Sequence, residues 1–384
     1  MSVVLVSNEQ SIRGVRKMSI QSRETIVAAD LQQAAEEFVA AGFGSLELRV
    51  QDGPDVWCGA AGVRELGTTE LPPPAGLVRV GSVTKTFVAT IVLQLVAEDR
   101  LTLDTSVAEH LPRFELDPRI TVRMLLDHTS GLFNYTGEYY PDGTVVPGLP
   151  ATGADWANHR LDSYTPDALV EFALSKPARF EPGTEWSYAN TNYTVAALLI
   201  EAITGRTFAA ELDSRIIQPL GLTSTIEPGD RVDLPGPHSH GYFRYQDGEE
   251  SKLVDVTEQN PSLLFAAGSM LSTSQDLQVF MSALQSGKLL PADLLEQMRT
   301  PQPLSGPLNY ALGLFAQDTG TETIYHHNGS APGGYGALMY SSADGTRTLT
   351  AAITMGDADV NILEVFPPAL DRLVQAVFTP MRVA

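Results

Sequence analysis

The chain has 384 residues, 43% of them hydrophobic, which is enough to bury a sizeable core in two domains or in one domain with an insertion. It carries 46 acidic against 25 basic residues, a formal net charge of −21. Because such a charge repels phosphate backbones and anionic membrane surfaces, we expect neither nucleic acid nor a membrane as a partner.

The N-terminal segment lacks the features of an export signal. Its apolar run covers only residues 3–6, whereas a secretory signal needs a basic start and ~7–15 apolar residues. No run elsewhere approaches the ~18 apolar residues of a membrane span. We therefore expect residues 1–25 to be a disordered extension, with Met1 or Met18 as the native start. We also expect a cytoplasmic protein, or an exported one if a signal has been removed.

The first hundred residues predict a helix, a strand pair and a buried helix. Residues 25–42 carry apolar side chains at helical spacing. Residues 44–53 and 55–63 indicate two strands joined by a tight Asp-Gly turn. Residues 84–99 are apolar almost all round, which favours a helix buried in a core. The only cysteine, Cys58, falls in the second strand, and we interpret it as a core residue.

Further along, an irregular stretch is followed by helices and then by strands. Residues 133–165 are rich in proline, glycine and aromatic residues and predict a long loop. Helical patterns follow at 166–176, 191–204, 207–217, 274–286 and 360–378. Strand patterns separated by tight turns lie at 310–318, 322–329, 336–342 and 346–356.

Strands near both ends of the chain, with helices between them, predict an α+β fold. We expect an antiparallel sheet flanked by helices, with a helical lobe inserted into it. Residues 26–90 and 265–384 would form the α/β sheet domain. Residues 91–264 would form the mainly helical inserted domain.

Ser82 and Lys85 lie at the start of the buried helix. Residues three apart share a helix face, so the amine would lie beside the hydroxyl. Burial and the positive end of the helix both disfavour a charged lysine, and a neutral amine can share the proton of a serine nucleophile. The same pattern is also typical of a capping serine followed by a lysine whose amine reaches solvent.

Two further motifs hold polar groups that can carry chemistry. Tyr188 and Asn190 point the same way in an extended segment, where a tyrosine can relay protons and an asparagine can orient a lysine. Equally, Asn190 could cap the next helix and Tyr188 could pack its ring. His327 and Gly329 lie at the end of a strand before a glycine-rich bend, where backbone N–H groups can bind an oxyanion.

Metal binding is not expected. His326 and the pair His238 and His240 are candidate ligands, but no carboxylate or cysteine completes a set at a recognisable spacing.

The order of the three motifs resembles that of the penicillin-recognising serine enzymes, the family of class C β-lactamases, serine D-alanyl-D-alanine carboxypeptidases and related esterases. The resemblance covers most of the chain from about residue 28. It rests on stretches such as VRVGSVTKTFVATIVLQLVAEDRL, ITVRMLLDHTSGLFNYT, SYANTNYTVAALLIEAITG and AAGSMLSTSQDLQVFMSALQSGKL. It implies a β-lactamase/transpeptidase-like fold with the site between the sheet and the inserted lobe.

The resemblance also implies roles for the motif residues. Ser82 would be the nucleophile and Lys85 its proton partner. Tyr188 would be general base and later general acid, while Asn190 would hold Lys85 and the substrate. His327 would take the place of the lysine or histidine of the third motif.

The resemblance extends to the groups around these side chains. The backbone N–H groups of Ser82 and Ser330 would form the oxyanion hole, and Gly329 would let the substrate approach the strand. His128, in HTSGL, is interpreted as framework. Tyr139 and Trp156 in the long loop could wall the cleft, although a small local core there is equally consistent.

Three departures from the carboxypeptidases concern the substrate. Phe315 stands where a basic residue is expected to bind the substrate's terminal carboxylate, and Asn328 stands in place of a threonine that helps it. Leu263 replaces an expected tryptophan. Because a phenyl ring cannot pair with a carboxylate, we predict a substrate without a required free carboxylate.

We therefore predict a serine acyl-transfer enzyme that works through an acyl-Ser82 intermediate on a small ester or amide, without a cofactor. It would be an intracellular esterase, amidase or transacylase of specialised metabolism, with water or an amine as acceptor. The enzymatic alternative is a D-alanyl-D-alanine carboxypeptidase or a class C-like β-lactamase. The alternative outside catalysis is a β-lactam-binding module. The acyl group and the oligomeric state are left open.

Overall fold

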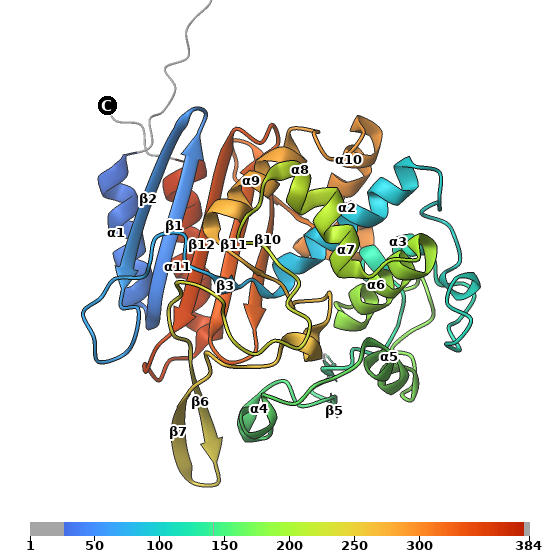
Figure 1. The fold of residues 1–384 in the computed structure, drawn as a ribbon, viewed down its shortest axis with the longest axis horizontal. Helices are drawn as coiled ribbons and strands as arrows, with labels where there is room; N and C mark the ends of the chain where they lie inside the picture. The colour runs from blue at the N-terminus through green and yellow to red at the C-terminus, as the bar shows by residue number, and fades with distance from the viewer. Residues whose placement is uncertain (1–26, 141, 380–384) are drawn as a thin grey trace, which may run out of the picture.

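The structure is a computed structural model that describes residues 27–140 and 142–379, so the predicted extension at 1–25 lies outside the described residues. Its centre is a six-stranded antiparallel sheet in the order β2-β1-β12-β11-β10-β9 (Figure 1). The N-terminal part supplies β1 (Phe43–Asp52) and β2 (Asp55–Gly62). The C-terminal part supplies β9 (Phe315–Asp318), β10 (Thr323–Ala331), β11 (Tyr335–Ser342) and β12 (Arg347–Met355). Since β1 pairs with β12, both ends of the chain close one sheet, as predicted.

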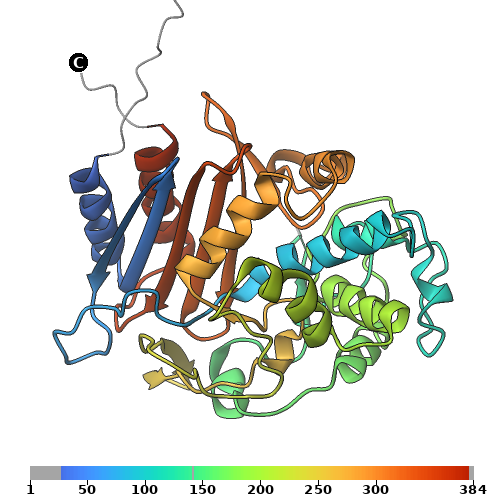
Figure 2. The ribbon, with the colours of Figure 1, turned by 45° about the horizontal axis from the view of Figure 1, so that its top comes forward.

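Helices cover both faces of this sheet (Figures 1 and 2). α1 (Ala28–Ala40) and α11 (Ile362–Phe378) pack together on one face, over an apolar cluster that includes Phe38, Leu46 and Phe378. α9 (Ser274–Gln285) covers the other face and contacts β11 and β12. The α+β class and the flanked antiparallel sheet are therefore confirmed.

The other half of the molecule surrounds α2 (Thr84–Ala97), which is buried along most of its length, as its apolar sequence predicts. Phe87 of α2 stacks on Phe280 of α9 with 3.6 Å between ring centroids, so α2 joins the two halves. α2 runs without a break through residue 90, where the domain division was expected. The helices α6 (Asn190–Thr204) and α7 (Phe208–Leu212) contact α2, while α3 (Val122–Leu126) and α5 (Pro166–Leu174) pack against α6. The same half of the molecule also holds α8 (Gln218–Leu220), which contacts α9, and α10 (Ala292–Arg299).

Several short elements escaped prediction because they are too short for a periodic pattern. The stretch 133–165, predicted as a long loop, contains β4 (Gly137–Tyr139), β5 (Val145–Pro147) and α4 (Gly153–His159). A hairpin of β6 (Tyr242–Asp247) and β7 (Glu250–Asp255) extends from the body in Figure 1. Two-residue strands β3 (Val78–Arg79) and β8 (Leu271–Ser272) pair beside the start of α2.

The expectation of a buried Cys58 was wrong. Cys58 lies on the predicted strand, but this strand is β2, at the edge of the sheet, and the thiol is exposed. Side chains alternate along a strand, so the neighbouring Trp57 packs against the cluster under α1 while Cys58 points to the opposite side. There its Sγ accepts a hydrogen bond from Arg49 at 3.0 Å.

None of the helices in the described ranges combines the length and the apolar character that crossing a membrane requires.

Candidate active site

Ser82 lies in a single 3₁₀ turn, Gly81–Val83, between β3 and α2. The turn is held from both sides. Before it, the N–H of Val80 donates to the carbonyl of Met270 at 3.1 Å, next to the β3–β8 pair. After it, Thr84 Oγ1 donates to the Gly81 carbonyl at 2.8 Å and accepts from the N–H of Met270 at 3.3 Å. These bonds fix the serine at the N-terminal end of α2.

Two glycines let this turn lie directly against β10. A Cβ on Gly81, which has a φ of +53°, would overlap the backbone of Ser330 and come within 2.6 Å of its nitrogen. A Cβ on Gly329 would overlap the carbonyl oxygen of Val80 and come within 2.9 Å of the nitrogen of Ser82. The backbone nitrogens of Ser82 and Ser330 are thus brought close to each other, which is the arrangement that an oxyanion hole needs.

Lys85 is buried, and its amine makes three contacts. Nζ lies 3.1 Å from Ser82 Oγ, 2.9 Å from Asn190 Oδ1 and 2.6 Å from the carbonyl oxygen of Ala267. Burial lowers the pKa of this amine well below its usual range, which favours the neutral form. The Asn190 and Ala267 oxygens can only accept, so they take both N–H groups of a neutral amine. Its lone pair is then left for the hydroxyl proton of Ser82.

Tyr188 lies over this pair, with its ring centroid 4.7 Å from Lys85 Nζ. Loss of solvent raises the pKa of its hydroxyl, although contact with the Ser82 side chain opposes the shift. At neutral pH, Tyr188 is therefore a phenol that can donate its proton, rather than a phenolate.

His327 faces the same space from β10 and is 1% exposed. Its Nδ1 lies 2.7 Å from the carbonyl oxygen of Asn328 and so carries the proton, while Nε2 is buried without a partner. Burial lowers the pKa of His327 to about 3, so the imidazole is neutral at neutral pH. Nε2 is an acceptor available for an N–H or O–H group of a bound molecule.

Three aromatic side chains surround His327. Its ring centroid lies 5.2 Å from that of Phe315, 6.0 Å from that of Tyr310 and 6.5 Å from that of Tyr188. Phe315, at the start of β9, therefore places an apolar ring beside His327.

His128 supports the Tyr188 segment from behind. It is buried, and its Nδ1 accepts hydrogen bonds from the N–H of Ala189 at 3.2 Å and from the side chain of Asn192 at 3.0 Å. Its ring centroid lies 4.3 Å from that of Tyr188. These contacts agree with the interpretation of His128 as framework.

Three further groups at the site lie outside the three sequence motifs. Thr136 Oγ1 accepts from Asn190 Nδ2 at 3.2 Å, and Asn134 Oδ1 accepts from the backbone N–H of Asn190 at 3.0 Å. Together they turn Asn190 Oδ1 toward Lys85. The third group is the Ala267 carbonyl, and a backbone oxygen is present in every residue type. The FNYT letters beside HTSGL were the available signal for Asn134 and Thr136.

Three predicted substrate-binding residues lie further from this group. The Asn328 side chain alternates to the other face of β10 from His327 and contacts the Tyr340 hydroxyl. Tyr139 is 69% exposed on β4. Trp156 is buried in an apolar cluster with Tyr135 and Leu263, where it packs against Gly333 in the turn after β10.

The other candidate ligands are paired within the protein. His240 Nδ1 bonds to Asp255 at 2.7 Å, and His238 Nδ1 bonds to the Gly236 carbonyl at 2.6 Å. Over residues 27–140 and 142–379, no group of three or more His, Cys, Asp or Glu side chains is placed to hold a metal ion.

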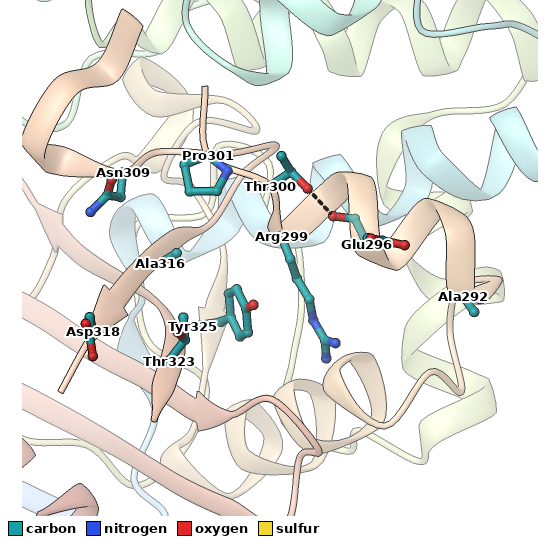
Figure 3. A pocket seen from close by; sticks show the side chains of 10 residues that line it. All are labelled: Ala292, Glu296, Arg299, Thr300, Pro301, Asn309, Ala316, Asp318, Thr323 and Tyr325. Carbon is teal, nitrogen blue, oxygen red and sulfur yellow. Dashed lines mark hydrogen bonds between the residues drawn. The ribbon is translucent and has the colours of Figure 1, made fainter. Parts of the chain in front are cut away.

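A separate open pocket of about 730 Å³ lies between α10 and the β9–β10 edge (Figure 3). Arg299 of α10 crosses it and places its guanidinium 5.0 Å from the ring of Tyr325. None of the motif residues lines this pocket. This pocket is therefore separate from the Ser82–Lys85 group.

Comparison with known proteins finds relatives over most of the chain. The sequence model of the family described as Beta-lactamase matches residues 31–355. A solved D-stereospecific amidohydrolase from Streptomyces sp. has a TM-score of 0.79 and 35% identity, and the match covers 92% of this chain and 99% of that chain. Putative penicillin-binding protein PbpX of Bacillus subtilis is 27% identical over 330 residues, 85% of this chain and 75% of the relative. Esterase EstB of Burkholderia gladioli is 37% identical over 250 residues, 59% of this chain and 62% of the relative.

Proposed function

The chain belongs to the β-lactamase family of penicillin-recognising serine enzymes, whose fold and serine-hydrolase chemistry it shares, and from that premise we propose that it transfers the acyl group of a small ester or amide through an acyl-Ser82 intermediate. The observation that carries this proposal is the triple contact of Lys85. It leaves the lone pair of the amine for the Ser82 proton.

In the acylation step, Lys85 takes the proton of Ser82 as Oγ attacks the carbonyl carbon of the donor. The oxyanion is held by the backbone N–H groups of Ser82 and Ser330. Losing one such hydrogen-bond donor typically lowers turnover by about 10²–10³-fold. Tyr188 gives its proton to the leaving group. This assigns to Lys85 the base role for Ser82 that the resemblance gave to Tyr188, because the raised pKa of Tyr188 leaves it protonated at neutral pH, with no phenolate available to take the Ser82 proton.

In the second step, the acceptor, water or an amine, attacks the acyl-enzyme. The Tyr188 phenolate formed in the first step takes the acceptor's proton, and protonated Lys85 returns a proton to Ser82 as the product leaves. Atoms and charges balance over the cycle. No metal or organic cofactor enters either step.

We propose a donor without a required free carboxylate because Phe315 gives the site an apolar wall next to a neutral His327. A carboxylate there would lose its water without gaining a cation. The same argument favours a substrate from specialised metabolism over a cell-wall peptide. We propose that the enzyme acts inside the cell, and fractionation of the producing cells tests this localisation. The likeness to a D-stereospecific amidohydrolase supports an amide donor of D configuration as the first to assay.

Intact-protein mass spectrometry with a fluorophosphonate tests the nucleophile. We expect one adduct in the native enzyme, none in Ser82→Ala, and an unchanged adduct in Ser251→Ala, a control on the exposed β7 hairpin. An adduct that persists in Ser82→Ala contradicts the assignment.

Turnover of matched donors tests the substrate class. We expect hydrolysis of a neutral amide or ester, with an added amine diverting the acyl group if the enzyme is a transacylase. Release of D-alanine from a D-alanyl-D-alanine peptide at a higher kcat/KM than from its carboxamide would instead indicate the carboxypeptidase. Acylation by penicillin with no turnover of any donor would indicate a β-lactam-binding module.

A further inference from the structure

The carbonyl that binds Lys85 belongs to a strained turn. Ala267 O accepts from Lys85 Nζ at 2.6 Å, and the residue before it, Ala266, has a φ of +54°. A non-glycine residue rarely adopts this left-handed conformation unless its surroundings hold it there. The turn is closed from one side, where Ala267 and Gly268 both donate to the Leu264 carbonyl, at 2.9 and 2.8 Å.

The other side of the turn is held by Ser269, which is 1% exposed. Ser269 Oγ accepts a hydrogen bond from the N–H of Ala266 at 3.0 Å. The same hydroxyl donates to Glu227 Oε2 at 2.6 Å. Because a hydroxyl has one proton, an acceptor at Glu227 directs that proton away from the turn and leaves a lone pair for Ala266.

Glu227 is half-buried and comes from the segment after α8, where Ile226 bridges to Leu271 of β8. Its Oε1 is buried without a hydrogen-bond partner among the described side chains, although the backbone of Gly229 also acts on the carboxyl and opposes the rise of its pKa. The charged side chain of β3 on this side, Arg79, lines a small pocket with Ser269 but donates to the Val232 and Thr257 carbonyls. Burial raises the pKa of Glu227 to about 7. Its carboxyl therefore changes charge near neutral pH.

We propose that Glu227 is a positioning residue for the reaction, holding the Ala266–Gly268 turn through Ser269 so that the Ala267 carbonyl stays on Lys85. This inference rests on the proposed function only in that Lys85 is the group that takes the Ser82 proton. When Glu227 is ionised, it is a stronger acceptor, the turn is firmer, and Lys85 keeps its best hydrogen-bond acceptor. Weakening this series of hydrogen bonds, from Glu227 through Ser269 to the Ala267 carbonyl, should destabilise the ammonium form of Lys85 and lower the pKa of Lys85.

The direct test reads Lys85 itself. The chain has five lysines, so ¹³C-lysine NMR gives few signals, and Lys85→Met assigns the one of interest. We expect the titration midpoint of Lys85 to fall by about one pH unit, a tenfold change in proton affinity, in Glu227→Gln. Ser269→Ala should lower it similarly, and the double variant should add little, because both changes break one chain of contacts.

Control measurements separate this route from others. Glu47→Gln removes another buried carboxyl, on β1, and should leave the Lys85 midpoint unchanged. The signals of Lys176, Lys252 and Lys288 report whether each variant is folded. A fall in Glu227→Gln without one in Ser269→Ala would mean that the Glu227 charge acts through space, and it would overturn the positioning role. No shift in either variant would also overturn it.

A second readout distinguishes this inference from the proposed function. Single-turnover acylation by the fluorophosphonate should slow by roughly tenfold in Glu227→Gln at pH 8, consistent with loss of a hydrogen bond to a charged group. The variant should also lose the part of the pH profile that titrates near pH 7. If native protein is not acylated at Ser82, the proposed function fails. If it is acylated and Glu227→Gln behaves identically at every pH, this inference fails alone.

Discussion

At the scale of single residues, the proposed preference for a donor without a free carboxylate depends on Phe315. Phe315 begins β9, where its ring stacks on His326 and lies edge-on to His327, with 5.2 Å between the Phe315 and His327 ring centroids. A terminal carboxylate bound beside it would need a cation. Replacing Phe315 with arginine should therefore change the preference of the enzyme and not only its rate. The charge-assisted hydrogen bonds of a guanidinium to a carboxylate are each worth about 1.5–3 kcal/mol.

We expect Phe315→Arg to raise kcat/KM for a peptide that ends in a D-alanine carboxylate, relative to its carboxamide, by about tenfold or more. The measurement is a competition assay with both substrates in one tube. Phe315→Leu removes the ring without adding charge and should leave that ratio unchanged. If both variants show the same ratio, Phe315 does not face the leaving group.

At the scale of elements, the contact between the Gly81–Val83 turn and β10 is what fixes Ser82 beside the strand. We expect Gly329→Ala to lower the free energy of unfolding by about 3 kcal/mol or more, because its Cβ would overlap the Val80 carbonyl oxygen. Urea unfolding measures the loss, and residual acylation should fall with it. Gly236→Ala is the matched control, since its Cβ would meet only the Leu77 side chain, at 3.1 Å. Equal losses in both variants would contradict the close approach.

The other face of β10 holds a histidine whose burial makes folding sensitive to acid. His326 lies between the rings of Phe315 and Tyr340, with centroids 5.3 and 4.4 Å away, and burial lowers its pKa to about 3. Below about pH 6.5, the unfolded chain binds a proton there that the folded protein excludes until about pH 3. Stability is therefore lost as the pH falls through this window, by up to about 1.4 kcal/mol per pH unit.

We expect His326→Phe to flatten the acid side of the stability curve between pH 6 and pH 4, in urea titrations at several pH values. His159→Gln, at an exposed histidine on α4, should leave the native slope in place. A His326→Phe variant with the native slope would mean that other groups control acid unfolding.

At the scale of the whole molecule, the two halves share a core. The apolar cluster around α2 includes Tyr335 and Met339 of β11 as well as Val195 and Leu199 of α6, and the sheet closes only when β1 meets β12. We therefore expect one cooperative unfolding transition. Trp57 reports on the sheet half, and Trp156 and Trp186 report on the other half, so variants that keep one tryptophan each should unfold with the same midpoint. Separate midpoints would mean that the halves unfold independently.

Whether a contact is local in the chain or joins distant segments explains what could be predicted from the sequence. Ser82 and Lys85 lie within one helical turn, so their contact follows from local geometry, and the apolar surroundings of the pair predict its burial. The glycine at 329 was expected to let a ligand approach the strand, whereas in the structure it is the chain's own Val80–Ser82 backbone that lies against it. The contacts of the Ala267 carbonyl with Lys85 and of the Thr136 hydroxyl with Asn190 could not be predicted, because they join segments far apart in the chain. In addition, the Ala267 carbonyl is a backbone group, which every residue type has. Cys58 was misjudged because the composition of a strand does not tell whether it lies at the edge of a sheet.

The position of Cys58 has a practical consequence. The only sulfhydryl is exposed on β2, at one edge of the sheet, whereas the turn that carries Ser82 lies against β10, near the other edge. A maleimide dye on β2 and a serine-directed fluorophore at Ser82 can therefore be attached independently, without adding or removing a residue. Energy transfer between the two dyes would report, in single molecules, whether the distance between β2 and the Ser82 turn changes when the serine is acylated.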